Sequence, residues 1–166
     1  YDQAAVLQRE VADRMLSRLE YIRIQPECTL DAGAGTGYCG EKLRALHPKA
    51  RLIELDIAQS MLQVSRNKQT WWQRKLPFLS STSPWQVCAD IESIPLANES
   101  VNMVWSNLAM QWCNTPDVAF AEFNRVLKVD GLLMFSTLGP DTLKELRAAF
   151  AGLDGASHVN QFIDMH

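Results

Sequence analysis

The chain has 166 residues, of which 47% are hydrophobic and 21% charged, a balance typical of one globular domain that excludes a disordered or collagen-like chain. Its net charge of −3, from 16 basic and 19 acidic residues, argues against a general nucleic-acid-binding protein. No apolar run approaches the roughly 20 residues that span a bilayer, so we expect no membrane partner.

The cysteines and histidines predict neither a disulfide framework nor a metal site. The four cysteines form no C-x-x-C pair, and the three histidines lie far apart in the sequence. Reduced thiols are typical of a cytoplasmic protein, which is the location we expect. Because the chain begins at Tyr1 and ends shortly after the apolar pair Phe162 and Ile163, we expect residues 1–166 to form a single domain that is incomplete at its C-terminal side.

Hydrophobic periodicity predicts helices that alternate with short strands. Steps of three and four residues place Val6, Leu7, Val11, Met15 and Leu19 on one face of a helix over residues 2–19. The expected strands cover residues 28–31, 51–56, 85–89, 101–106 and 132–137, and the later helices 38–46, 58–67, 116–127 and 141–153. This order predicts an α/β fold, with a parallel sheet, helices on both of its faces and ligands at the carboxyl ends of the strands.

A glycine-rich loop follows the first predicted strand, where backbone N–H groups can approach a ligand. In one register, Gly35, Gly37 and Gly40 match the G-x-G-x-x-G fingerprint of nicotinamide-dependent oxidoreductases, with Asp56 as the ribose-binding acid. In the other, Asp31 precedes glycines at 33, 35 and 37, the pattern of class I S-adenosylmethionine (SAM) methyltransferases. The second register is favoured, because the strand ends at Asp31 and its carboxylate suits a cationic amine better than a pyrophosphate.

Two more carboxylates that follow predicted strands are candidates for binding a nucleoside. Asp56 ends the second strand, where it can accept hydrogen bonds from both ribose hydroxyls or cap the following helix. Asp90 ends the third strand, where it can bind an adenine amino group while Ile91 covers the ring. A role in a local turn is the alternative for Asp90.

Four segments together resemble the class I SAM-dependent methyltransferases in their expected order: residues 30–37, 54–56, 89–96 and 125–131. Residues 1–5, 106–113 and 158–162 also resemble the malonyl-[acyl-carrier protein] O-methyltransferases of biotin synthesis. The resemblance implies a Rossmann-like fold with a seven-stranded sheet, SAM as cofactor and S-adenosylhomocysteine (SAH) as product. The sequence departs from this pattern, because too few residues follow Leu138 to form the last two strands, so we expect these strands to be missing from this chain. The resemblance implies that the cofactor is bound by Asp31, Gly33, Ala34, Gly35, Gly37, Asp56, Ile57, Met61, Asp90, Ile91 and Asn107.

The resemblance also implies a malonyl thioester on acyl-carrier protein as the methyl acceptor. A malonyl carboxylate is already ionised at pH 7, so its methylation needs no general base. Tyr1, Gln111 and Trp112 are candidate neutral donors to this carboxylate, and Arg147 is a candidate charge partner. Packing of a short helix is the alternative for Gln111 and Trp112, and a solvated helix face is the alternative for Arg147.

Residues 69–84 contain two tryptophans, two prolines and a Ser-Ser-Thr-Ser run, and we expect them to form a surface excursion. Because acyl-carrier protein is acidic, the nearby basic residues Arg66, Lys68, Arg74 and Lys75 are candidates for docking it. A solvated loop is the alternative.

Three other functions stay open at this stage. The chain could methylate another small carboxylic acid or a carbon acceptor, as trans-aconitate or quinone-biosynthesis methyltransferases do. It could be a methyltransferase-like assembly protein, although intact Asp31, Asp56 and Asp90 argue against the loss of a cofactor site. It could also be a nicotinamide-dependent oxidoreductase that uses the Gly35 register, but Asp90 would then have no assigned role.

Overall fold

The computed structural model describes residues 5–73 and 83–150, and within them it contains one five-stranded sheet. The strands are β1 (Cys28–Ala32), β2 (Arg51–Asp56), β3 (Trp85–Cys88), β4 (Val101–Asn107) and β5 (Leu127–Ser136). Their spatial order is β3-β2-β1-β4-β5, and every neighbouring pair is parallel. The strand order reverses at β1, so the ends of β1 and β4 flank the switch point where open parallel sheets bind ligands.

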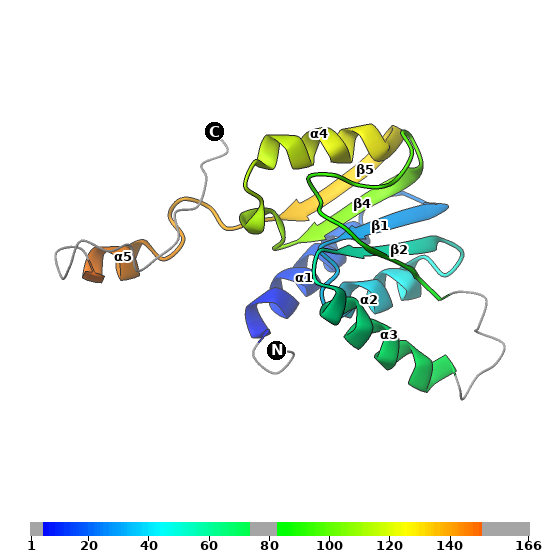
Figure 1. The fold of residues 1–166 in the computed structure, drawn as a ribbon, viewed down its shortest axis with the longest axis horizontal. Coiled ribbons are helices and arrows are strands. Elements are labelled where there is room, and N and C mark those ends of the chain that lie inside the picture. The colour runs from blue at the N-terminus through cyan, green and yellow to red at the C-terminus, as the bar shows by residue number, and fades with distance from the viewer. Residues whose placement is uncertain (1–4, 74–82, 151–166) are drawn as a thin grey trace.

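Helices cover both faces of this sheet, as the sequence predicts (Figure 1). The helices α1 (Val6–Leu19), α2 (Tyr38–Leu46) and α3 (Gln59–Gln73) lie on one face, and α4 (Pro116–Val126) lies on the other. A short 3-10 helix, η2 (Met110–Trp112), follows β4. The last described helix, α5 (Lys144–Phe150), lies at the end of an extended segment, apart from the sheet.

Two hydrophobic clusters attach the helices to the sheet. One packs Leu30 and Val104 of the sheet against Phe123 of α4. The other packs Trp105 of β4 against α1 and α2, with Leu16 among its buried residues. Because helices cover both faces, the central strands β1 and β4 are buried along nearly their whole length instead of at alternate residues.

The structure corrects several predicted boundaries. Helix α3 continues to Gln73, so the predicted excursion over residues 69–84 begins as helix; no glycine or proline interrupts the sequence before Pro77. Strand β5 begins at residue 127, because Leu127 pairs with Val101 before an irregularity in the register. Helix α5 spans only residues 144–150 of the predicted 141–153, and residues 151–153 lie outside the described part of the chain.

The apolar face predicted for α1 is only partly buried. Val6 and Leu7 are exposed, whereas Ala12, Met15, Leu16 and Leu19 are buried. This end of α1 borders the cavity described below, which leaves its first turn outside the core.

The sheet of the described residues has β3 and β5 at its edges, and most of β5 is half-exposed. It thus holds five of the seven strands that the resemblance implies. None of the described helices is long and apolar enough to cross a membrane.

Candidate cofactor site

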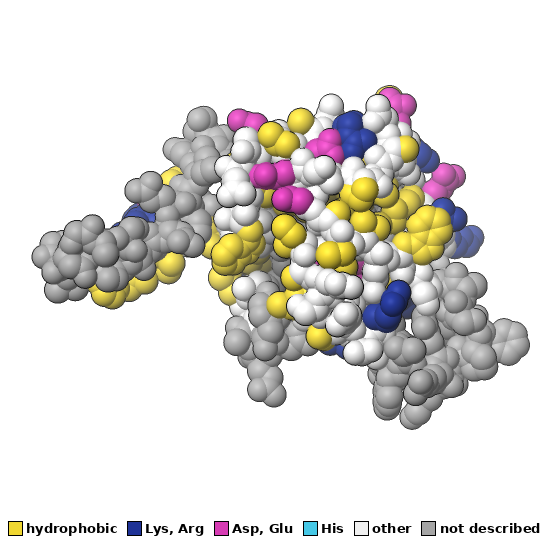
Figure 2. All heavy atoms as spheres, viewed as in Figure 1, with side chains coloured by type: hydrophobic (Ala, Val, Ile, Leu, Met, Phe, Trp, Pro, Cys, Tyr) yellow, Lys and Arg dark blue, Asp and Glu magenta, His cyan; other side chains and the backbone are white. Residues whose placement is uncertain are grey.

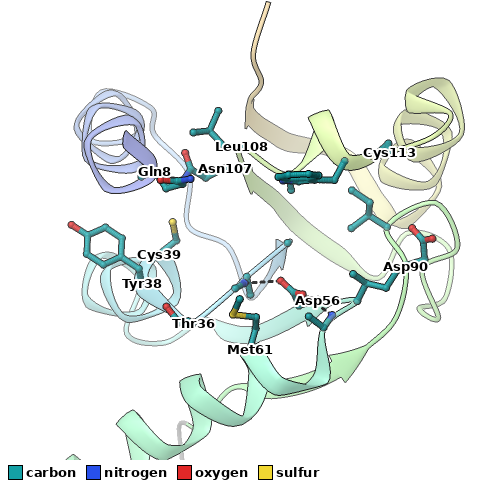
Figure 3. A pocket seen from close by; sticks show the side chains of 18 of the residues that line it. Gln8, Thr36, Tyr38, Cys39, Asp56, Met61, Asp90, Asn107, Leu108 and Cys113 are labelled. Atoms are coloured by element: carbon teal, nitrogen blue, oxygen red, sulfur yellow. Dashed lines mark hydrogen bonds between the residues drawn. The ribbon is translucent and has the colours of Figure 1, made fainter. Parts of the chain in front are cut away.

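A cavity of about 490 Å³ lies across the carboxyl ends of the strands, a volume typical of small-molecule sites. Figure 3 shows Gln8, Tyr38 and Cys39 on one side of it, Asp90 and Cys113 on the opposite side, and Asp56 between them. The structure brings nine of the predicted cofactor residues into its wall: Gly33, Ala34, Gly35, Asp56, Ile57, Met61, Asp90, Ile91 and Asn107.

The loop after β1 forms a part of the wall where backbone is exposed to the cavity. The amides of Gly33 and Ala34 donate to the carbonyl of Leu55 at 2.8 and 3.0 Å, which joins the loop to the end of β2. Gly33 has φ +83°, and a Cβ there would lie 2.4 Å from Cβ of Ala109, so this position requires glycine. Gly35 has φ +54°, but a Cβ there would meet no heavy atom within 4 Å. A ligand can therefore approach the backbone closely at Gly35.

Asp56, the last residue of β2, connects this loop to the start of α3. Its Oδ2 accepts a hydrogen bond from the amide of Gly35 at 2.8 Å, and its Oδ1 accepts one from the amide of Ala58 at 2.8 Å. A carboxylate has about four acceptor sites, so each oxygen retains one for a ligand in the cavity. The local capping role and the predicted ribose contact are thus compatible.

Two more carboxylates lie at the β3 side of the cavity. Asp90 Oδ1 accepts a hydrogen bond from the amide of Glu92 at 2.9 Å, the turn role that the sequence left as an alternative, and Asp90 also lines the cavity. Glu92 lines the cavity too, and its Oε1 accepts from the amide of Thr115 at 2.6 Å. Asp56, Asp90 and Glu92 make this end of the cavity acidic.

Asp31 lies in β1 and not in the cavity wall. Its side chain is buried, and its Oδ2 has no hydrogen-bond partner among the described residues. Burial, with smaller contributions from the charges of Glu54 and Asp56, raises the pKa of Asp31 well above its usual range. A buried carboxyl oxygen without a partner, close to the glycine-rich loop, is a feature that a cationic group would satisfy.

Glu54 lies directly opposite Asp31 in the β1–β2 register, and its carboxylate accepts hydrogen bonds from neighbouring side chains. Its Oε2 accepts hydrogen bonds from Ser65 Oγ at 2.7 Å and Gln86 Nε2 at 2.9 Å. Gly37 packs against the same group, since a Cβ there would lie 2.2 Å from Ser65 Oγ. Gly37 therefore supports the start of α2 and does not line the cavity.

Asn107, at the end of β4, lines the cavity and also holds α1 in place. Its Nδ2 donates to the carbonyl of Gln8 at 2.9 Å, and its Oδ1 accepts a hydrogen bond from Ser136 Oγ at 3.0 Å. Ser136 Oγ in turn accepts from the amide of Leu108 at 3.0 Å. Both polar groups of the Asn107 side chain are thus engaged in joining the first turn of α1 to the ends of β4 and β5.

The structure does not bring the four predicted catalytic residues together. Trp112 lines the cavity and is 75% exposed. Gln111 does not line it, and its buried Oε1 has no hydrogen-bond partner among the described residues. Arg147 lies on α5, outside the cavity wall, and its guanidinium donates to backbone carbonyls of its own segment. Tyr1 lies outside the described residues.

The predicted docking residues are only partly described. Arg66 and Lys68 are exposed on α3, and Lys68 Nζ donates to the carbonyl of Thr36 at 3.1 Å. Arg74 and Lys75 lie outside the described part of the chain. On the face shown in Figure 2, acidic, basic and hydrophobic side chains of the described residues are interspersed.

The cysteines in the cavity wall are protonated thiols at neutral pH. Burial, together with the charges of Glu92 and Asp90, raises the pKa of Cys113 to about 11. Burial also raises the pKa of Cys39. Thiols of this kind are poor nucleophiles. No histidine is among the described residues that line the cavity, and the described residues contain no group of three side chains suited to a metal ion.

Sequence reasoning did not find the part of the wall that α1 and the start of α2 supply. Gln8, Arg9 and Tyr38 line the cavity, although only a helix was predicted for residues 2–19. The available signal is the polar character of Gln8 and Arg9 beside Val6 and Leu7, but periodicity alone does not reveal where a helix packs.

Comparisons with known proteins agree with this geometry. A family model described as "Methyltransferase domain" matches residues 30–135. Over its whole length, the chain is 64% identical to a malonyl-[acyl-carrier protein] O-methyltransferase from Laribacter hongkongensis and 58% identical to one from Gallionella capsiferriformans. It spans about half the length of these curated relatives, 56% in both cases.

A solved structure supports the fold itself. The crystal structure of a SAM-dependent methyltransferase from Thermotoga maritima matches with a TM-score of 0.64 and 16% sequence identity, over 90% of this chain and 64% of that one. The family model covers more than half of the 166 residues, and its range includes the glycine loop, Asp56, Asp90 and Asn107. The chain therefore belongs to the methyltransferase-domain family and has a class I, Rossmann-like methyltransferase fold.

Proposed function

We propose that the chain binds SAM in this cavity and transfers a methyl group to the free carboxylate of a malonyl thioester on acyl-carrier protein, a step of biotin synthesis. The observation that carries the proposal is the 64% identity to a malonyl-[acyl-carrier protein] O-methyltransferase, which extends over every residue of this chain. The cavity supports it independently, because the charges and glycines of its wall suit a nucleoside with a cationic amino-acid part.

In this proposal, the cofactor lies across the ends of three strands, with its adenine near β3, its ribose near β2 and its methionine part near β1. Asp90 and Ile91 hold the adenine, and Asp56 holds the ribose with the acceptor sites that its backbone contacts leave open. The exposed backbone at Gly35 allows the methionine part to lie against the loop. The unpartnered Oδ2 of Asp31 favours a cationic group above that loop. Bound SAM supplies an electrophilic methyl group on a sulfonium and leaves as a neutral thioether.

A malonyl carboxylate as methyl acceptor agrees with a cavity wall whose described residues include no histidine or ionised thiol to act as a general base. A malonyl carboxylate is ionised at pH 7, so the protein has only to position it. The raised pKa of Cys113 and of Cys39 keeps these thiols protonated, and no described histidine lines the cavity to act as a base. Trp112 supports the proposal as a donor at the cavity, and Tyr1, Gln111 and Arg147 stay proposed partners of the acceptor.

The carrier and the cellular location belong to the same proposal. Docking of an acidic carrier by Arg66, Lys68, Arg74 and Lys75 predicts that added salt weakens carrier binding much more than SAM binding. All four cysteines, each of which lies in the described residues, are free thiols, which supports a reducing, cytoplasmic location.

The first experiment is a calorimetric titration of the chain with SAM, SAH and NAD, followed by transfer of a labelled methyl group from SAM to malonyl-carrier protein. We expect SAM and SAH to bind and NAD not to bind. Asp56→Asn should weaken SAH binding about tenfold or more, since charge-assisted hydrogen bonds are worth roughly 1.5–3 kcal/mol. The same carrier with its malonyl group already methylated is the control acceptor. NAD binding, or equal labelling of both carriers, would contradict the proposal.

A further inference from the structure

The connection between β3 and β4 supplies the acidic end of the cavity and contains no helix or strand of its own. It spans residues 89–100, and Asp90, Ile91 and Glu92 in it line the cavity. The amide of Glu92 donates to Oδ1 of Asp90 at 2.9 Å, which closes a local turn. Such a turn fixes the shape of these few residues but not their place relative to the sheet. The contacts made by the rest of the connection therefore decide where Asp90 stands.

Two side chains of α4 hold the middle of this connection. The amide of Ile94 donates to Oε2 of Glu122 at 2.7 Å, and the carbonyl of Ile94 accepts from Nη2 of Arg125 at 2.7 Å. Nη1 of Arg125 donates to the carbonyl of Leu96 at 2.7 Å and to Oδ1 of Asn98 at 3.0 Å. Four hydrogen bonds therefore join this stretch of irregular backbone to one helix.

Arg125 and Glu122 also bind each other, through two parallel N–H···O bonds. Nε of Arg125 donates to Oε1 of Glu122 and Nη2 donates to Oε2, both at 2.7 Å. Their side chains are only 31% and 19% exposed. Hydrogen bonds from Arg125 lower the pKa of Glu122, so the pair is charged at neutral pH. The planar guanidinium can bind the carboxylate and both carbonyls of the connection at once, an arrangement that the ammonium of a lysine cannot reproduce.

Helix α4 meets the connection at both ends. Just before the helix, the amide of Thr115 donates to Oε1 of Glu92 at 2.6 Å. In its last turn, the carbonyl of Arg125 accepts from the amide of Glu99 at 2.9 Å. No residue of α4, the whole of which the structure describes, lines the cavity, and the helix lies on the face of the sheet opposite α1, α2 and α3 (Figure 1). The helix therefore acts on the cavity through the connection that it holds.

We propose that Arg125 and Glu122 are positioning residues for the base of the cofactor: they hold the β3–β4 connection where Asp90 can accept a hydrogen bond from the adenine amino group. The inference rests on the proposed function. The held residue Ile94 lies four residues after Asp90, and the amide of Ser93 between them donates to the carbonyl of Asp90 at 3.1 Å. A displacement of about 1 Å takes an N–H···O contact outside hydrogen-bond distance, so loosening the connection should remove the preference for adenine.

The test compares two ligands that differ in the base. SAH carries the 6-amino group of adenine, whereas S-inosylhomocysteine carries a 6-oxo group in its place and keeps the ribose and the amino acid. In calorimetric titrations of the full chain, below the Tm of every variant, we expect the unaltered chain to prefer SAH about tenfold or more. Arg125→Lys keeps the positive charge and loses the planar group. It should weaken SAH binding about tenfold and S-inosylhomocysteine binding less than about twofold.

Two further variants complete the comparison. Glu122→Gln keeps an oxygen that can accept from the Ile94 amide and loses the charge, so its effect on SAH binding should have the same direction and be smaller. It also tests the inference if Arg125→Lys does not fold. Arg14→Lys is the matched control, because Arg14 pairs with Glu10 on α1 at 2.8 Å in an exposed helical ion pair. It should change the affinity for neither ligand.

Hydrogen exchange measures the positioning without any ligand. The hydrogen bond from the Glu92 amide to Asp90 depends on the arrangement of the connection. In Arg125→Lys, exchange of this amide should accelerate about tenfold, because the connection then opens more often. In Arg14→Lys it should not change.

Three outcomes would overturn this inference alone. Equal weakening of both ligands by Arg125→Lys would mean that the pair acts on the shape of the whole cavity. A lowered Tm with unchanged SAH affinity would mean that the pair only stabilises the fold. Equal affinity of the unaltered chain for SAH and S-inosylhomocysteine would mean that Asp90 does not distinguish the bases, although the cofactor binds. Failure of the unaltered chain to bind SAH at all would overturn the proposed function together with this inference.

Discussion

The substitution Gly35→Ala distinguishes an effect on cofactor affinity from an effect on the stability of the fold. A Cβ at this position would meet no heavy atom within 4 Å, and Gly35 lines the cavity, so we expect the added methyl group to occupy space that is open to the ligand. The φ of +54° makes the substitution strained in the backbone alone. Gly35→Ala should therefore have a small effect on folding and a large effect on the cofactor.

The two effects can be given magnitudes. The left-handed conformation costs alanine about 1–2 kcal/mol, and the lower entropy of the unfolded chain offsets about 0.4–1 kcal/mol of this. A net loss of about 1 kcal/mol lowers the Tm of a chain of this size by roughly 2–4 °C. In the cofactor complex the methyl group competes with the ligand for space, and overpacking of this kind costs about 1–3 kcal/mol. SAH binding should therefore weaken about tenfold or more.

Calorimetric titration with SAH and thermal unfolding measure the two effects in the same preparation. Gly139→Ala is the matched control, because a Cβ there also meets nothing within 4 Å and its φ is not positive. It should leave both SAH affinity and Tm nearly unchanged. If Gly35→Ala lowers the Tm as expected but binds SAH as tightly as the parent chain, the cofactor does not lie against this loop, and the assignment of the cavity is wrong.

Three further predictions concern the same region. Gly33→Ala combines left-handed strain with a 2.4 Å approach to Cβ of Ala109, so urea unfolding should show a loss of about 2–5 kcal/mol, and a loss below 1 kcal/mol would contradict the packing. Burial raises the pKa of Asp31, so the carboxyl loses its proton at a lower pH in the unfolded chain than in the folded chain. The free energy of unfolding therefore falls as the pH rises from about 4 through the folded-state pKa of this group. Asp31→Asn should therefore gain stability over the parent between pH 4 and pH 8 in urea unfolding, and parallel pH profiles would refute this. Asn107→Asp replaces the donor to the Gln8 carbonyl with an oxygen, so hydrogen exchange in the first turn of α1 should accelerate about tenfold, and unchanged exchange would exclude an anchoring role.

The cofactor side of the cavity was largely predictable from the sequence. Gly33 and Gly35 follow β1 directly in the sequence. Asp56 is the last residue of β2, and Asp90 lies two residues beyond the end of β3. Since parallel strands bring their carboxyl ends to one edge of the sheet, such residues converge without knowledge of side-chain contacts. The local context of each residue was therefore sufficient to place most of the predicted cofactor residues in the cavity wall.

The positions of the predicted acceptor-binding residues were much less predictable. Gln111 and Trp112 are neighbours in the sequence, yet only Trp112 lines the cavity, because the 3-10 helix turns the two side chains apart. Arg147 lies on a helix that makes its own carbonyl contacts away from the sheet. These outcomes depend on turn geometry and on long-range packing, to which hydrophobic periodicity is insensitive.

The amino-acid sequence by itself determined the order and type of the elements, the parallel sheet and the glycine-rich loop after the first strand, because spacing of apolar residues, glycine positions and strand-end carboxylates act within a few residues of the chain. Only the tertiary structure decided that the first turn of α1 closes one end of the cavity, that Asn107 holds it there, and that Asp31 is buried beneath the loop instead of lining the wall. Asn107 and Gln8 are 99 residues apart, and their contact exists only because the sheet brings the end of β4 beside α1. Contacts of this kind depend on the packing of the whole domain.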